Sequence, residues 1–372
     1  MSGALAKGRA DRAATACRLV GIAVGTVLLL GTPAAQGFEL TPLPTKAERR
    51  EAKRMSNIVF RLRFPLVEFA LHSFSTPVHE ALTQAGFDCE GGIDTCTDLE
   101  LDFAPGGVIA GVRWNDDPPF QFGDGQGRYT GCPNSRTSTI SFALRTLCWY
   151  NHFKDIAAIA EVNPEAYTGG SGTMLARSHF GDLQFLHAMA PRVGTPAQDT
   201  KAKIMMWAEF AWRVQSGGAD FIAATTRTGA VAVAGFQDHF PKKEVRSVSD
   251  LFTVGRPWLR HQLDDIAFGS LLHVIEDSFA GGHVARGGPP AAGCAAAPIV
   301  AFHTYAGQDK AAHKLRDGLD HAQTKASLIE VLRELVARRD ANQSWAELRP
   351  YLDECVFRLA DDAGDASTAV DD

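Results

Sequence analysis

The chain has no excess of basic residues: 37 Lys and Arg stand against 43 Asp and Glu, a formal net charge of −6 at pH 7. A globally acidic protein is not built to bind a nucleic-acid backbone tightly through its net charge. Three common catalytic signatures are missing: a Gly-x-Ser-x-Gly elbow, a Walker phosphate-binding loop and a His-Glu-x-x-His motif. Internal repeats are missing and alternating strand patterns are few. These absences argue against α/β-hydrolases, P-loop enzymes, thermolysin-type proteases and repeat proteins.

Long apolar runs are also scarce, and the clearest one, residues 19–30, lies near the N-terminus behind four basic residues. It is too short for a membrane span, and the small residues around Ala35 and Gly37 suit a cleavage site. We therefore predict that residues 1–37 are a signal peptide and that the protein is exported to the periplasm or outside the cell. An uncleaved membrane anchor is the alternative.

Cysteine is infrequent, and one of the seven cysteines, Cys17, leaves with the predicted signal. An even number then remains, which in an exported chain predicts up to three disulfides. Cys89 and Cys96 are close enough in sequence to close one short loop. The other four are Cys132, Cys148, Cys294 and Cys355.

The apolar periodicity predicts a mostly helical protein. We expect an all-α, single multi-helix domain over residues 38–360, followed by a frayed acidic tail at 361–372. Residues 86–137, rich in Gly, Asp, Pro and Cys, predict an irregular, disulfide-pinned region. Ser344 and Glu347 form a capping box that opens the last helix. The expected helices are 46–63, 76–82, 141–160, 174–189, 201–215, 258–280, 299–338 and 344–359.

The segment 271–284 has the spacing of a metal site. His273 and Asp277 are four residues apart, so they share one face of the expected helix. Gly281 and Gly282 break that helix and let His283 turn back toward the same face. Imidazole and carboxylate together are the ligands that suit zinc and its neighbours. Thirty residues on, His313 and Asp317 repeat the four-residue step.

In these motifs the chain resembles the bacterial zinc-dependent phospholipases C and the related single-strand-specific zinc nucleases. Their central His-x3-Asp-x5-His motif is matched by His273, Asp277 and His283, and their His-x3-Glu motif by His313 and Asp317. Their Gly-x4-Asp motif is matched upstream by Gly111 and Asp116. Residues 178–182 match Ser-His-Phe-x-Asp, and an early helical histidine is matched by His79. The order of the motifs is kept over residues 76–320.

The resemblance implies an all-α fold that presents a cluster of two or three zinc ions. It assigns one zinc to Asp116, His179, His273 and Asp277. It assigns a second to His283, His313 and Asp317. A third would share Asp277 and use His79. A hydroxide bridging two ions would be the nucleophile, and Asp116 would orient or deprotonate the attacking water.

Two residues depart from the family pattern. An N-terminal tryptophan completes the third zinc in the family, but no tryptophan precedes His79 here, so another group such as His187 or His72 would have to serve. In choline-selective members the residue after the ligand Asp is aromatic, whereas here it is Asp117. His187 and His303 are further candidates near the site, and Glu276 and Asp182 are candidates to orient its imidazoles.

The resemblance implies a secreted zinc phosphodiesterase, most simply a phospholipase C. Such an enzyme hydrolyses phosphatidylcholine-type lipids at a membrane surface to diacylglycerol and a phosphorylated head group. A single-strand-specific nuclease is the first alternative, which the acidic charge makes less favoured. A secreted binding protein whose zinc ions only staple the helices is the second. No protein partner is indicated.

Overall fold

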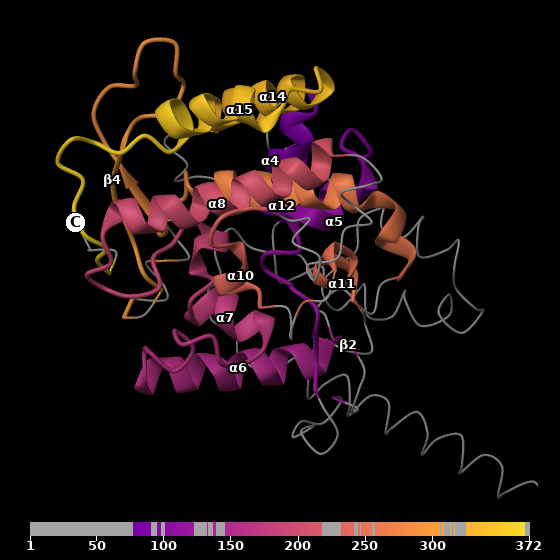
Figure 1. Cartoon of the computed structure of the whole chain (residues 1–372), viewed down its shortest axis with the longest axis vertical. Coiled ribbons are helices and arrows are strands. Elements are labelled where there is room, and N and C mark those ends of the chain that lie inside the picture. The colour runs from indigo at the N-terminus through magenta and orange to yellow at the C-terminus, as the bar shows by residue number, and fades with distance from the viewer. Residues whose placement is uncertain are drawn as a thin grey trace, which may run out of the picture. The chain divides into compact units, whose positions relative to one another are not determined.

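Helices dominate the part of the chain that the structure describes. The computed structural model describes residues 77–90, 95–97, 101–122, 132, 137–138, 146–217, 232–241, 245, 247–254, 257–305, 307–308, 313, 316 and 325–368. The helices, in the labels of Figure 1, are α4 (Val78–Gly86), α5 (Gly106–Val112), α6 (Thr146–Val162), α7 (Met174–Phe180), η2 (Gln184–His187), α8 (Ala197–Ser216), α10 (Phe236–His239), α11 (Val248–Thr253), η4 (Pro257–Gln262), α12 (Leu263–Asp277), α14 (Lys325–Asp340), α15 (Trp345–Tyr351) and η6 (Leu352–Val356). The prediction of a mostly helical protein is confirmed.

Several predictions concern residues outside this description: the signal peptide, the helix at 46–63, His72 and the ligand Asp317. Within the described ranges, no helix combines the length and the apolar character that crossing a membrane requires. The two antiparallel ladders are short. They pair β1 (Phe120–Gln121) with β2 (Thr137–Ser138) and β3 (Val284–Arg286) with β4 (Ile299–Phe302).

Helix α12 is the buried element that the site is built on. It is buried around its whole circumference from Ile266 to Asp277, and it packs against α5, α8 and α4 (Figure 1). Two glycines let α5 and α12 touch backbone to backbone. A Cβ atom at Gly111 would lie 2.1 Å from the Ile266 carbonyl oxygen, and one at Gly269 would lie 2.0 Å from the Val108 carbonyl oxygen. The close packing of α5 on α12 therefore requires a glycine at Gly111, the first residue of the Gly-x4-Asp motif.

An aromatic core anchors the turn that follows α5. The Trp114 ring stacks on Trp207 of α8 with centroids 5.6 Å apart, and it meets the edge of Phe252 at 5.1 Å. Its indole N–H donates to the Leu251 carbonyl at 3.2 Å. Buried aromatic rings carry large apolar areas, and the indole donor is satisfied here as burial requires. This packing fixes the residue two positions before Asp116.

Two of the predicted helices are wrong in extent. The helix expected at 174–189 ends at Phe180, because Gly181 passes so close to Tyr167 that a Cβ atom would lie 2.4 Å from the Tyr167 carbonyl oxygen. The segment 299–338, in which Gly307 and Gly318 were expected breaks, is not one helix: among the described residues His313 and Arg316 are helical, and α14 begins at Lys325. The first residues of the segment form strand β4 instead, which pairs with β3. Ile299 and Val300 are β-branched and favour a strand, which the apolar pattern alone did not reveal.

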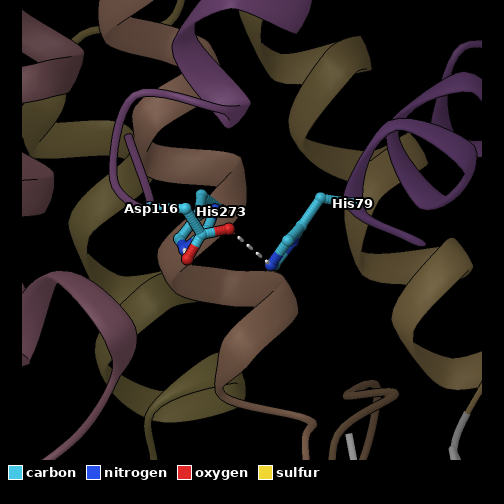
Figure 2. A group of neighbouring side chains, drawn as sticks. All are labelled: His79, Asp116 and His273. Carbon is cyan, nitrogen blue, oxygen red and sulfur yellow. Dashed lines mark ion pairs between the residues drawn. The ribbon is translucent and has the colours of Figure 1, made fainter. Parts of the chain in front are cut away.

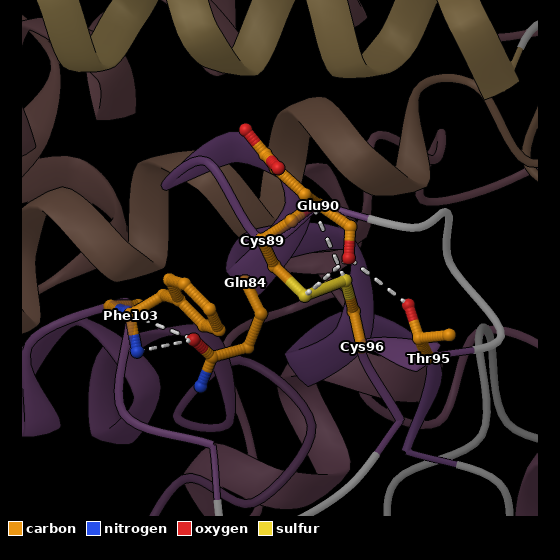
Figure 3. Close-up of a disulfide and its surroundings, with 7 residues drawn as sticks. Gln84, Cys89, Glu90, Thr95, Cys96 and Phe103 are labelled. Carbon is orange, nitrogen blue, oxygen red and sulfur yellow. Dashed lines mark hydrogen bonds between the residues drawn. A yellow bond between two sulfur atoms is a disulfide. The ribbon is translucent and has the colours of Figure 1, made fainter.

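Three disulfides join the six cysteines: Cys89–Cys96, Cys132–Cys148 and Cys294–Cys355. The short Cys89–Cys96 loop is the one that the sequence predicted. Figure 3 shows this disulfide beside the end of α4, where the Gln84 side chain accepts hydrogen bonds from the backbone N–H groups of Phe103 and Ala104 at 3.1 and 2.9 Å. Disulfide bonds are consistent with an exported protein.

The C-terminal segment does not fray where it was expected to. Residues 361–368 run alongside β4 and are hydrogen-bonded to β4 and to the segments next to it. The Gly364 N–H donates to the Val300 carbonyl at 2.9 Å, and the Ala366 N–H donates to the Thr195 carbonyl at 2.8 Å. Ala366 is buried. Small side chains allow this close approach, so the composition that suggested a loose tail serves packing instead.

Candidate metal centre

Six buried side chains from five segments converge at α12. His79 comes from α4, Asp116 from the turn after α5, His179 from α7, His187 from η2, and His273 and Asp277 from α12 itself. Each is at most 4% exposed. They form three overlapping groups whose ligand atoms are close enough to hold a metal ion: His79–Asp116–His273, Asp116–His179–His187 and His187–His273–Asp277. We call these six residues the metal cluster; Figure 2 shows three of them.

On α12 the four-residue spacing does what was predicted. His273 Nε2 lies 3.0 Å from Asp277 Oδ2, so the two side chains share a helix face and point at the same place. Burial by itself raises the pKa of Asp277, but the neighbouring imidazoles of His283, His273 and His187 outweigh it and hold this pKa well below its ordinary value. Asp277 is therefore a carboxylate at neutral pH.

Asp116 stands between the histidines. Its Oδ2 is 3.8 Å from His79 Nε2, an ion pair drawn in Figure 2, and its Oδ1 is 4.0 Å from His179 Nε2 and 3.9 Å from His273 Nε2. Neither oxygen has a hydrogen-bond partner among the described residues. Burial, with the negative charge of Asp277 beside it, raises the pKa of Asp116 well above its ordinary value. A buried carboxylate in this state needs a cation to be stable in its charged form.

Backbone carbonyls set the tautomers of three histidines. The Nδ1 atom of His179 faces the Leu175 carbonyl at 3.0 Å, that of His273 faces the Val112 carbonyl at 2.7 Å, and that of His283 faces the His187 carbonyl at 2.7 Å. A carbonyl only accepts, so Nδ1 carries the proton and Nε2 carries the lone pair. Burial also lowers the pKa of His179 and His273, which keeps them neutral. Neutral imidazoles with a defined lone pair are what metal ligation requires.

Of the two carboxylates that were predicted to orient imidazoles of the site, Glu276 does so and Asp182 does not. Glu276 accepts hydrogen bonds from His79 Nδ1 at 2.6 Å and from the Thr83 hydroxyl at 2.7 Å, so it does orient an imidazole of the cluster. Asp182 instead accepts two hydrogen bonds from Arg177, at 2.9 and 2.7 Å, and faces His239 at 3.7 Å. Asp182 thus stabilises the turn after α7.

The predicted second site is assembled in part. The rings of His283 and His313 are stacked with centroids 5.3 Å apart, and His283 Nδ1 lies 3.5 Å from Asp277 Oδ2. Gln308 bonds His313 Nδ1 through its carbonyl oxygen and donates to the Gly282 carbonyl at 2.9 Å. The third predicted ligand, Asp317, lies outside the described residues. His303 lies beside this pair, where burial lowers its pKa to about 4.

His187 was expected near the site, as one group that could replace the missing tryptophan at the third zinc. A helix face shared with His179, eight residues earlier, does not bring it there, because α7 ends at Phe180. A different turn brings it in: η2 ends at His187, and Ala188 adopts a left-handed conformation with φ 51°. Since that turn depends on contacts with distant segments, the sequence carries no clear local signal for it.

Carboxyl groups outnumber cationic side chains around the cluster. Five buried carboxyl groups act on one another here, against one neighbouring buried guanidinium, that of Arg113, among the residues described. They are Glu80, Asp116, Asp117, Glu276 and Asp277. In its ionised form, a buried carboxylate without a cationic partner costs on the order of several kcal/mol, because it loses its hydration. Divalent cations would offset it.

Comparison with known proteins gives no relative: no family model, no curated protein and no solved structure matches this chain. The donor set fits zinc on its own chemistry. Imidazole nitrogens and carboxylate oxygens are zinc ligands, and Asp116 Oδ1 and His179 Nε2, which lie 4.0 Å apart, have no hydrogen-bond partner in the described structure.

Proposed function

We propose that this protein is an exported zinc-dependent phosphodiesterase of the phospholipase C type. It would hydrolyse phosphatidylcholine-type lipids to diacylglycerol and a phosphorylated head group. The observation that carries the proposal is the metal cluster: six buried His and Asp side chains, five of which occur in the chain order of the zinc phospholipase C motifs.

Each residue has a defined task in this proposal. His79, His179 and His273 present Nε2 and the two aspartates present carboxylate oxygens, so these residues hold the ions. Bound zinc lowers the pKa of a coordinated water and offsets the negative charge of the phosphodiester. Asp116 orients the attacking water or accepts its proton.

Lipid is favoured over nucleic acid by charge. The chain is acidic overall, and the carboxyl groups that surround the metal cluster would repel a polyanion unless several cations offset them. A single phosphodiester with a cationic head group does not meet the same repulsion. Asp117, buried beside Asp116, adds negative charge at this side of the cluster.

The experiment measures bound metal and turnover on the same purified protein. Metal content is determined by atomic spectroscopy, and phosphatidylcholine hydrolysis is followed before chelation, after it and after zinc is restored. Asp116→Asn removes the proposed water-orienting carboxylate, and Asp199→Asn, at an exposed position in the first turn of α8, is the matched control. We expect bound zinc, chelator-sensitive hydrolysis, and at least a hundredfold loss of turnover in the Asp116 variant alone.

Other outcomes lead elsewhere. A protein that binds no metal contradicts the metal centre itself. Bound zinc with cleavage of single-stranded DNA and no lipid hydrolysis identifies a nuclease. Bound zinc without any turnover, combined with a large loss of stability in the Asp116 variant, identifies a staple, because structural zinc sites are closed by four protein ligands.

A further inference from the structure

His187 occupies a place that the phospholipase C motifs leave unassigned. Its Nδ1 atom is 2.9 Å from Asp277 Oδ2, 3.1 Å from His273 Nε2 and 3.6 Å from Asp116 Oδ1. All three of these atoms belong to residues that the motifs assign to a metal. The imidazole is 3% exposed, and its other nitrogen has no hydrogen-bond partner in the described part of the chain.

The backbone holds His187 in this position from two sides. Its carbonyl accepts the hydrogen bond from His283 Nδ1, and the carbonyl of Leu186 accepts one from the Asn115 amide at 2.7 Å. Asn115 in turn accepts a hydrogen bond from Ser270 of α12 at 2.6 Å. The turn that carries His187 is therefore bonded to residues adjacent to the cluster.

The spacing of donor atoms matches one coordination sphere. Ligands around a tetrahedral zinc lie about 3.3 Å from one another, given Zn–N distances of about 2.0–2.1 Å. The distances from Asp116 Oδ1 to His187 Nδ1, His273 Nε2 and His179 Nε2 are 3.6, 3.9 and 4.0 Å, and His187 and His273 are 3.1 Å apart. Asp116 Oδ1, His187 Nδ1 and His273 Nε2 thus lie close to that spacing from one another, and His179 belongs to one candidate metal group with Asp116 and His187.

We propose that Asp116, His179, His187 and His273 form one divalent-cation position, with His187 as a nitrogen ligand through Nδ1. This inference rests on the metal centre of the proposed function and places His187 where the resemblance placed Asp277. Asp277 is then available on the other side: its Oδ1 lies 3.5 Å from His79 Nε2, and Asp116 Oδ2 faces the same atom. Asp116 thus offers Oδ1 to this position and Oδ2 to the adjacent one, and Asp277 offers Oδ1 to the adjacent one.

The use of Nδ1 makes the assignment testable by spectroscopy. The neighbouring histidines His179 and His273 hold Nδ1 against backbone carbonyls and would bind through Nε2. Heteronuclear NMR of the full mature protein loaded with an NMR-active cadmium isotope reports which imidazole nitrogens couple to the metal. We expect one-bond coupling at His187 Nδ1 and at Nε2 of His179 and His273.

A second measurement uses Co²⁺ titration, followed by visible absorption. His187→Ala should lower Co²⁺ affinity by on the order of tenfold or more and change the absorption bands, since loss of even outer-shell partners costs 10–100-fold. His261→Ala, an exposed histidine on η4, is the matched control and should change neither. If the His187 variant does not fold, the cadmium experiment on the unaltered protein still decides.

The outcomes separate this inference from the proposed function. Bound cadmium without coupling to His187 overturns the inference and leaves the metal centre standing. Absence of any cadmium or cobalt binding overturns both. Coupling at His187 Nδ1 in a protein that hydrolyses neither phosphatidylcholine nor single-stranded DNA supports the inference and contradicts the enzyme.

Discussion

Glu276 accepts a hydrogen bond of 2.6 Å from His79 Nδ1, and both residues are fully buried. The two come from α12 and α4, 197 positions apart in sequence. The bond places the proton of His79 on Nδ1 and directs Nε2 toward Asp116 and Asp277. A carboxylate behind a metal-binding histidine is a frequent device for fixing its ring and its tautomer.

Removing this carboxylate should weaken metal binding. We expect Glu276→Leu to lower zinc affinity by about 10–100-fold, because His79 loses its orientation. Glu276→Gln keeps a carbonyl acceptor for His79 Nδ1 and should recover most of the affinity. Competition titration with a chelating dye measures both variants, and equal affinities in the two variants and the unaltered protein would sink the idea.

Gly111→Ala should separate α5 from α12. The new Cβ atom would lie 2.1 Å from the Ile266 carbonyl oxygen, and backbone cannot yield as a flexible side chain can. Overpacking of this kind costs about 1–3 kcal/mol, and it would also displace Asp116. We expect a lower free energy of unfolding by denaturant titration, together with weaker metal binding. Gly169→Ala is the control, since a Cβ atom there meets nothing within 4 Å.

Removing bound metal with a chelator should lower the thermal stability of the protein. A ligand at a thousandfold excess over its Kd stabilises the native state by about 4 kcal/mol. At about 2 °C per kcal/mol for a chain of this size, the Tm should fall by roughly 8 °C on metal removal. Differential scanning calorimetry with and without chelator measures the change. A Tm that does not move would contradict a metal in the buried cluster.

His152 should make the metal-free protein less stable in mild acid. Burial lowers its pKa to about 4, against about 6.5 when unfolded. Between these pH values the unfolded chain binds a proton at His152 that the folded chain does not bind. The free energy of unfolding therefore decreases as the pH is lowered, by up to about 1.4 kcal/mol per pH unit. Above about pH 6.5 the contribution is constant.

The pH effect is tested with His152→Gln, measured by urea unfolding at several pH values in the presence of chelator. Gln can keep the hydrogen bond to Thr173, whose hydroxyl lies 2.8 Å from His152 Nε2 and caps α7. Between pH 6.5 and 4, the change in the free energy of unfolding per pH unit should decrease by the contribution of about one proton. An unchanged slope would show that His152 is not the group responsible.

The sequence by itself determined the features that depend on local spacing. Residues four apart on a helix share a face whatever the fold, so His273 and Asp277 were predicted together and lie 3.0 Å apart. The capping box of Ser344 and Glu347 and the loop closed by Cys89 and Cys96 followed from neighbouring residues in the same way.

Only the tertiary structure decided which distant residues meet. His187 enters the cluster through a left-handed turn, and Glu276 finds His79 across two helices; neither contact has a sequence period. Strand β4 replaced an expected helix because its pairing partner β3 is available in the fold. Local propensity differs between these states by about 1 kcal/mol or less, so packing and pairing between distant segments select among them.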